Sequence, residues 1–295
     1  MPHLMAPGGG VRAPAGPTGR TGFGVPGWAH PMLAPVEWAA LSRPGLPLHW
    51  AVLDVAGGPG ARPDPYCLAA AAGLRESGVT VLGHLAMRDG TRSFGELVAD
   101  AHRFLDWYRV DGFYLADAPA ERAQLAETAR TVTTLRALCA QQRRYQRRHM
   151  PAPGPRAAAG TAGSGRVRAP GARHERVRAP KARAGAALVL GHGTHPHPGY
   201  ADMADQLVTF SGCWTDYRWS QAPEWTADHP PERFCHLVHG VPQMHIEEAL
   251  RIARWQGAGT VWFTDRTDRR GQNPWEALPG YWDELVSRLG PGVSE

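Results

Sequence analysis

The sequence predicts an α/β protein, a (β/α)8 TIM barrel interrupted by one inserted segment. Three observations lead to this prediction. The chain has 295 residues, and a barrel of this kind typically needs about 250. Short apolar runs alternate with helical stretches, which is the pattern of successive βαβ units. Several of the runs are apolar without interruption, as is typical of parallel strands covered on both faces.

Eight strands are predicted, each bounded by glycine, proline or polar residues. Strand–helix units that repeat eight times favour a sheet that closes on itself rather than an open one. The predicted strands are Phe23–Val25, His49–Asp54, Thr80–Leu85, Gly112–Leu115, Ala187–Leu190, Gln206–Phe210, Phe234–Val238 and Thr260–Phe263.

Local capping signals predict where several of the helices begin. Asp64 precedes Pro65, which places a cap before a proline at the first helical position. Ser93 and Glu96 have the spacing of a capping box. Two further helices are predicted to begin at Pro119 and Pro242.

The composition divides the chain into five parts. A segment between the fourth helix and the fifth strand is rich in Arg, Ala, Pro and Gly, has almost no core-forming residues, and is expected to be disordered. The predicted parts are a disordered N-terminal segment (1–21), the first half of the barrel (22–150), the disordered basic insertion (151–184), the second half (185–289) and a tail (290–295).

The positive net charge of +5 belongs to the insertion and its flank. Residues 143–183 contain twelve Arg or Lys and one acid, so this stretch carries +11 and the remainder of the chain −6. Arginine-rich segments bind polyanions by releasing counterions, so an anionic partner for the insertion is one expectation. A solvated loop expansion without a partner is the alternative.

Four cysteines without CxxC spacing are too few for a disulfide scaffold in a chain of this length. The first residues contain no apolar run that could serve as the core of a signal peptide, and no later stretch approaches the ~18 apolar residues of a membrane span. We therefore expect a cytoplasmic protein with no membrane partner.

Five segments resemble motifs of spherulation-specific family 4 and occur in the family's order. The segment Val25–Pro31 (VPGWAHP) is similar to the family's opening "VPLYVYP". The others are Gly58–Gly60, similar to the "NGPG" turn; Gly78–His84, similar to "GVKVLGYV"; Trp107–Tyr114, similar to "WYGVDGIFF"; and Asn273–Trp282, similar to "NPWDxLPSYW".

The resemblance implies a barrel related to glycoside hydrolases of the endo-α-1,4-galactosaminidase type. Such enzymes would carry an Asp–Glu pair ending the fourth strand and a Glu ending the sixth. Cleavage of a glycosidic bond needs one carboxylic acid to protonate the leaving oxygen and one carboxylate opposite it. Here the family's acid positions hold Ala116, Asp117 and Ser211. We therefore expect a catalytically degenerate barrel that binds a polysaccharide or amino sugar.

Two alternatives stay open at this point. In the first, the protein is an active glycosidase in which Asp117 works with Asp54 as a substitute partner. Without such a role, Asp117 would cap the helix that begins at Pro119, and Asp54 would form a turn. In the second, the barrel is an interaction scaffold that acts through its basic loop.

Aromatic and polar residues after the strand ends are the candidates for binding a saccharide or another small polar ligand. Pyranose rings stack on indole and phenol faces; the alternative is that these aromatic residues only cover the barrel rim. The candidates are Trp28, His30, His84, Trp214, Tyr217, Trp219 and Asp265.

Histidines near the strand ends raise the question of a metal site. Together with Asp54 and Asp117, they could form a carboxylate–imidazole site with a bound water. The HxxHxH spacing is not a motif that identifies a metal site, and prolines stiffen that loop, so we expect no metal and no cofactor. The histidines in question are His30, His84, His192, His195 and His197.

Overall fold

The computed structural model describes residues 21–27, 29–149 and 187–289. Trp28 lies outside the described residues, as do almost all of the predicted N-terminal segment, the basic insertion and the C-terminal tail.

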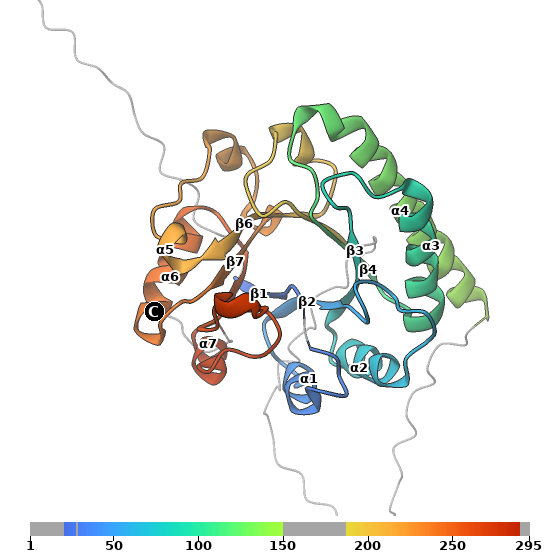
Figure 1. Cartoon of the computed structure of the whole chain (residues 1–295), viewed down its shortest axis with the longest axis horizontal. Helices are drawn as coiled ribbons and strands as arrows, with labels where there is room; N and C mark the ends of the chain where they lie inside the picture. Colours follow the sequence, from blue (N-terminus) through green and yellow to red (C-terminus); the bar gives the residue numbers. More distant parts are fainter. Residues whose placement is uncertain (1–20, 28, 150–186, 290–295) are drawn as a thin grey trace, which may run out of the picture.

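Within the described residues, eight parallel strands close into a barrel in chain order (Figure 1). This confirms the predicted (β/α)8 fold. The strands are β1 (Gly22–Val25), β2 (Leu48–Leu53), β3 (Thr80–Ala86), β4 (Gly112–Ala116), β5 (Ala187–Gly191), β6 (Gln206–Cys213), β7 (Phe234–His239) and β8 (Thr260–Phe263).

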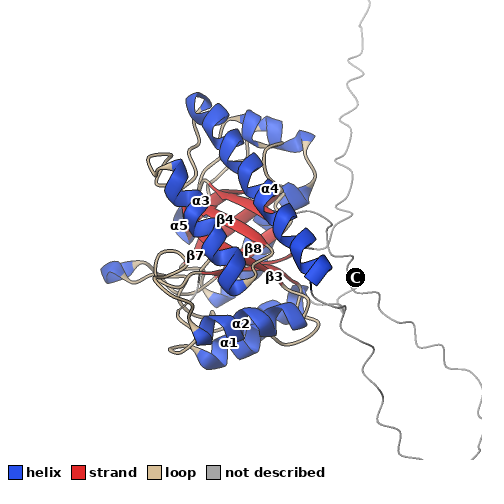
Figure 2. Ribbon diagram, turned by 90° about the vertical axis from the view of Figure 1, so that its right-hand side faces the viewer, coloured by secondary structure: helices blue, strands red, loops and turns tan. Residues whose placement is uncertain are grey.

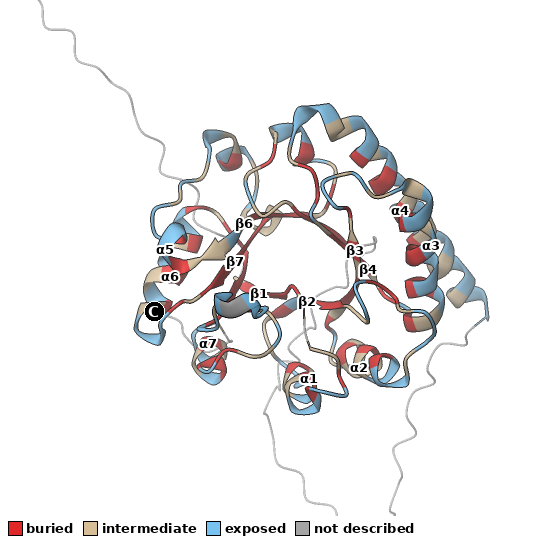
Figure 3. Ribbon diagram, in the orientation of Figure 1, coloured by how far each residue is buried: buried red, intermediate tan, exposed pale blue. Residues whose placement is uncertain are grey.

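Helices surround the barrel and cover the outer face of its strands (Figure 2). Their buried residues lie on the sides that face the strands (Figure 3). The α-helices in the described part of the chain are α1 (Pro35–Leu41), α2 (Pro65–Glu76), α3 (Phe94–Arg103), α4 (Leu125–His149), α5 (Trp214–Tyr217), α6 (Ile246–Trp255) and α7 (Trp282–Leu289).

Both predicted capping signals form as expected. The Asp64 side chain accepts hydrogen bonds from the backbone N–H groups of Tyr66 and Cys67 at the start of α2. Ser93 accepts from the backbone N–H of Glu96 and donates to its carboxylate at the start of α3.

Three predicted boundaries are wrong by more than one residue. The helix expected from Pro242 begins at Ile246, because residues 243–245 first form a 3-10 turn. In the other two places long-range hydrogen bonds decide the outcome. The helix expected from Pro119 begins at Leu125, after a short 3-10 turn, because Ala118 and Ala120 are hydrogen-bonded to the end of β5 and to the loop that follows it. Strand β6 continues past Phe210 to Cys213, because its register shifts between Val208 and Phe210 and it goes on pairing with β7.

A chain of polar side chains crosses the inside of the barrel near the N-terminal ends of the strands. The Trp50 indole donates to the Gln206 side-chain carbonyl at 2.7 Å, and the Gln206 amide donates to the Thr260 hydroxyl at 2.8 Å. These residues come from β2, β6 and β8, which are not neighbours in the sheet. Their side chains therefore meet in the interior and close this end of the barrel. Among the described helices, none combines the length and the apolarity needed to cross a bilayer.

Candidate functional site

The C-terminal ends of β2, β3 and β4 bring three polar side chains together in the barrel mouth. His84 Nδ1 lies 3.6 Å from an Asp54 carboxylate oxygen. The His84 ring stacks on Tyr114, with centroids 6.4 Å apart, and Tyr114 leans on the interior residue Trp50. Asp54, His84 and Tyr114 therefore line the inside of the mouth, above the polar chain that closes its other end.

Asp54 serves both the mouth and its own loop. One carboxylate oxygen accepts a hydrogen bond from the Gly58 N–H at 2.8 Å, and the other faces His84. The turn is tight, with Gly57 at φ 67° and Gly58 at φ 153°, conformations that glycine adopts without strain. Asp54 is thus the turn-forming aspartate of the alternative above and also a residue of the mouth.

Small residues occupy the rim where the family's Asp–Glu pair would begin. Ala116, the last residue of β4, pairs with Ala86 of β3 and with Gly191 of β5. A side chain at Gly191 would bring its Cβ within 2.7 Å of the Tyr114 hydroxyl oxygen. The row formed by Ala86, Ala116 and Gly191 therefore leaves room above Tyr114 and supplies no carboxylate.

Asp117 follows this row in a left-handed turn, at φ 49°, and is exposed. Its carbonyl accepts a hydrogen bond from the Asp89 N–H at 2.9 Å. It does not cap a helix, since α4 begins only at Leu125.

Ser211, at the sixth-strand acid position, lies within β6 and is exposed. Its backbone N–H donates to the carbonyl of Gly193, which ties β6 to the loop after β5. The serine leaves this part of the mouth without an acid.

The histidines that follow β5 have separate environments. His192 Nδ1 lies 3.2 Å from the Ala118 carbonyl, and burial lowers the pKa of His192 from 6.5 to about 4. Burial also lowers the pKa of His195. The His197 ring accepts from the Gly199 N–H at 3.1 Å and caps a short 3-10 turn.

The structure does not gather the proposed histidine and aspartate ligands into one metal site. Among the described residues, ligand atoms of three metal-binding side chains come together instead at His30, Asp64 and Cys67.

The aromatic candidates differ in how far they are exposed. Trp214 is only 5% exposed, packs on His245 and has the Arg218 guanidinium 5.6 Å above its ring. Tyr217 is fully buried, and its hydroxyl forms a 2.8 Å hydrogen bond with His236 Nδ1. Trp219 is 80% exposed. Trp214 and Tyr217 pack as part of the rim. Trp219 lies away from the mouth, because the carbonyl of the next residue, Ser220, accepts a hydrogen bond from the Gln256 side chain just after α6. The Arg218 guanidinium lies 5.8 Å over the Trp219 ring.

Asp265 connects two loops through a hydrogen bond. Its carboxylate accepts a hydrogen bond from the Gly280 N–H at 3.0 Å and so joins the segment after β8 to the segment before α7. This contact uses one oxygen of the exposed carboxylate.

Two histidines of β7 were not among the sequence candidates. His236 is fully buried, and its pKa is lowered to about 3, first by burial and then by the charge of His195. His239 ends the same strand and is also buried. The sequence does show two histidines within one otherwise apolar strand. A search for apolar runs alone does not single out such residues as site candidates.

Four of the described histidines have a buried ring nitrogen without a hydrogen-bond partner within the protein. The atoms are His84 Nδ1, His192 Nε2, His236 Nε2 and His239 Nδ1. Of these, His84 Nδ1 faces the Asp54 carboxylate at 3.6 Å.

Comparison with known proteins places the chain in a family. The sequence model of spherulation-specific family 4 matches residues 25–289. The chain belongs to this family. A solved structure of Aspergillus clavatus Sph3 in complex with GalNAc superposes with a TM-score of 0.63 at 20% identity and covers 92% of this chain and 98% of that one. A likeness at this identity shows that the two proteins share the barrel fold. A search of curated protein sequences finds no significant match to the chain.

Proposed function

We propose that the barrel mouth of this family member binds a saccharide, in the first place an amino sugar, without hydrolysing it. The observation that carries the proposal is the row of Ala86, Ala116 and Gly191 at the ends of β3, β4 and β5. Hydrolysis of a glycosidic bond requires two placed carboxyl groups. Where the family pattern puts acids on β4 and β6, this chain has Ala116 and Ser211. The GalNAc bound to Sph3 supports an amino sugar as the ligand class.

The polar groups that remain in the mouth suit sugar hydroxyls. Asp54 offers a carboxylate, His84 an imidazole beside it, and His192 a buried ring nitrogen without a hydrogen-bond partner within the protein. A buried polar atom left unpaired costs about 1–3 kcal/mol. A ligand hydroxyl that pairs with such an atom recovers part of that cost, which favours binding without any ionised acid at the rim.

Hydrolysis by Asp117 with Asp54 is the competing activity. It would require Asp54 to act as an acid or a base while it accepts a hydrogen bond from Gly58 and faces His84. It would also require Asp117 to reach the sugar from an exposed left-handed turn. The existing contacts of Asp54 and the exposed position of Asp117 therefore both favour sugar binding over hydrolysis. The cytoplasmic location and an anionic partner for the basic insertion stay predictions.

Calorimetry with α-1,4-linked oligomers of galactosamine and N-acetylgalactosamine tests the proposal. His84→Ala, which removes the imidazole that lies beside Asp54 and stacks on Tyr114 in the mouth, should weaken binding by about 1–3 kcal/mol, as the loss of a central contact does. Asp117→Asn should change the affinity much less, because its carboxylate lies in an exposed turn.

Trp255→Ala, at an aromatic residue outside the mouth, is the control. Trp255 is 90% exposed and lines a surface hollow of about 530 Å³ with Glu247 and Arg251. It ends α6 just before β8 begins, which places it at the opposite face of the barrel from the mouth. Absence of heat with every oligomer would favour the scaffold alternative. Binding that is lost in Trp255→Ala and kept in His84→Ala would place the ligand outside the mouth.

A further inference from the structure

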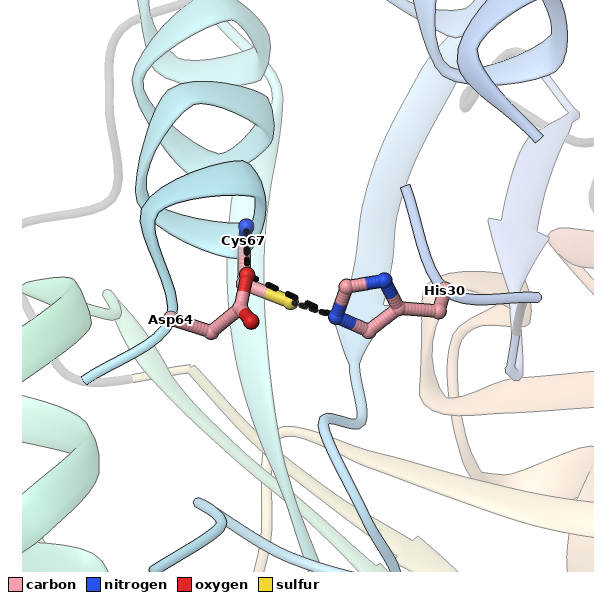
Figure 4. A group of neighbouring side chains, drawn as sticks. All are labelled: His30, Asp64 and Cys67. Atoms are coloured by element: carbon pink, nitrogen blue, oxygen red, sulfur yellow. Dashed lines mark hydrogen bonds and ion pairs between the residues drawn. The ribbon is translucent and has the colours of Figure 1, made fainter. Parts of the chain in front are cut away.

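Three potential metal ligands meet between the loop after β1 and the first turn of α2 (Figure 4). His30 Nε2 lies 3.5 Å from the Asp64 carboxylate and 3.5 Å from the Cys67 sulfur. All three ligand atoms lie within 4.8 Å of one another. Cys67 is buried, while His30 and Asp64 are partly exposed, so the cluster has one protected side and one open side.

Local structure holds each of these side chains in place. Asp64 is the cap of α2, and its carboxylate is oriented by the Tyr66 and Cys67 N–H groups at 2.9 and 3.0 Å. Cys67 is three residues further on, so the same helical turn presents its sulfur beside the cap. The turn after β1 fixes His30, whose carbonyl accepts from the Leu33 N–H at 2.7 Å. The cluster is therefore built before any ion arrives.

We propose that His30, Asp64 and Cys67 bind one divalent transition-metal ion of the zinc class, with a fourth position open to water or ligand. Zinc bonds of about 2.0–2.3 Å to N, O and S in a tetrahedron place neighbouring ligand atoms about 3.3–3.6 Å apart. The two distances of 3.5 Å agree with such tetrahedral edges. Sulfur and imidazole ligands select transition metals, whereas Mg²⁺ and Ca²⁺ prefer oxygen alone.

The sulfur of Cys67 would bind the ion as the thiolate. One thiol proton therefore passes to solvent for each ion bound.

The imidazole also changes tautomer. His30 Nδ1 accepts from the Met32 N–H at 3.3 Å, so Nε2 carries the ring proton in the metal-free protein. Metal binding at Nε2 moves this proton to Nδ1, and the long contact with Met32 opens.

The metal site is independent of the saccharide site. It uses Asp64 and Cys67, which have no part in the proposed saccharide contacts. His30, which the sequence suggested as a sugar-binding residue, becomes a metal ligand instead. The sequence expectation of no metal considered histidines near the strand ends and did not include Asp64 or Cys67. Metal binding and sugar binding can therefore fail separately.

Cobalt titration of the reduced, tag-free full-length protein tests the site. One equivalent of Co²⁺ should produce a near-ultraviolet thiolate-to-cobalt charge-transfer band and the intense visible bands of a tetrahedral ion. Cys67→Ser should abolish the charge-transfer band. Cys139→Ser, at a buried cysteine of α4, is the matched control and should keep it.

Asp64→Asn gives a second readout that does not depend on the thiol, since asparagine still caps a helix. Loss of an outer-shell partner already costs about tenfold in metal affinity, so loss of this charged ligand should cost at least that much. A folded wild type that shows no charge-transfer band with excess Co²⁺, or a band that survives Cys67→Ser, would overturn the proposal. Unchanged cobalt affinity in a folded Asp64→Asn variant would remove Asp64 from the site.

Discussion

Acidification should destabilise the barrel over a window set by two buried histidines, His192 and His236. Burial lowers the pKa of His192 from 6.5 to about 4, and burial with the charge of His195 lowers that of His236 from 6.5 to about 3. Above pH 6.5 these imidazoles are neutral in both the folded and the unfolded chain. As the pH falls below 6.5, these histidines become protonated in the unfolded chain but stay neutral in the folded protein. The free energy of unfolding therefore decreases.

The size of this decrease follows from the pKa differences. Each pKa unit corresponds to about 1.4 kcal/mol, so each histidine removes up to that much stability per pH unit within its window. For His192 the window closes near its folded-state pKa of about 4, for a total of about 3 kcal/mol. Such a loss is a large part of the stability of a typical domain, about 5–15 kcal/mol.

The variant His192→Asn isolates the contribution of one imidazole. The ring Nδ1 faces the Ala118 carbonyl at 3.2 Å, and an asparagine amide can donate to the same oxygen. Urea unfolding at a series of pH values between about 7 and 4.5 should give a shallower slope for the variant, by up to about 1.4 kcal/mol per pH unit. The carboxylates, which also titrate there, are common to both proteins and cancel in the comparison.

His102→Asn, on the exposed side of α3, is the control and should keep the wild-type slope. A His192→Asn variant whose stability falls with acid as steeply as the wild type would contradict the assignment of His192 as a buried neutral imidazole.

Two further predictions concern the mouth. Restoring the family acids with Ala116→Asp, Asp117→Glu and Ser211→Glu together should raise the hydrolysis of α-1,4-galactosaminoglycans above the negligible rate expected of the wild type. Release of reducing ends measures this hydrolysis. No gain in a folded triple variant would mean that the mouth has also lost its catalytic shape. Gly191→Val should weaken oligomer binding and lower the thermal midpoint, because its Cβ would lie 2.7 Å from the Tyr114 hydroxyl oxygen; an unchanged affinity would place the ligand away from this rim.

The elements that the sequence predicted well are those whose cause is local. Asp64 and Ser93 begin helices because each is hydrogen-bonded within its own first turn. The strands were visible because burial on both faces makes them continuously apolar. The start of α4 was missed because the hydrogen bond from Ala118 to the Gly191 carbonyl holds that segment in the rim, and such a partner is distant in the sequence.

The same distinction holds for the candidate site. That β4 lacks an acid at Ala116 could be read from a motif, and the structure adds only the neighbours of that position. The covering of Trp214 depends on His245, and the meeting of His30 with Cys67 depends on two separate loops. These contacts come from chain closure around the barrel, which no local pattern reports.

The central claim is that the mouth binds an amino sugar and leaves its glycosidic bonds intact. One NMR sample that contains the protein and an α-1,4-linked galactosamine oligomer tests both halves at once. The account predicts saturable broadening of the oligomer's anomeric signals and no new reducing-end signal over prolonged incubation. New reducing ends that disappear in Asp54→Asn or Asp117→Asn would show an active glycosidase, and an oligomer spectrum unchanged by the protein would show that the mouth does not bind this sugar.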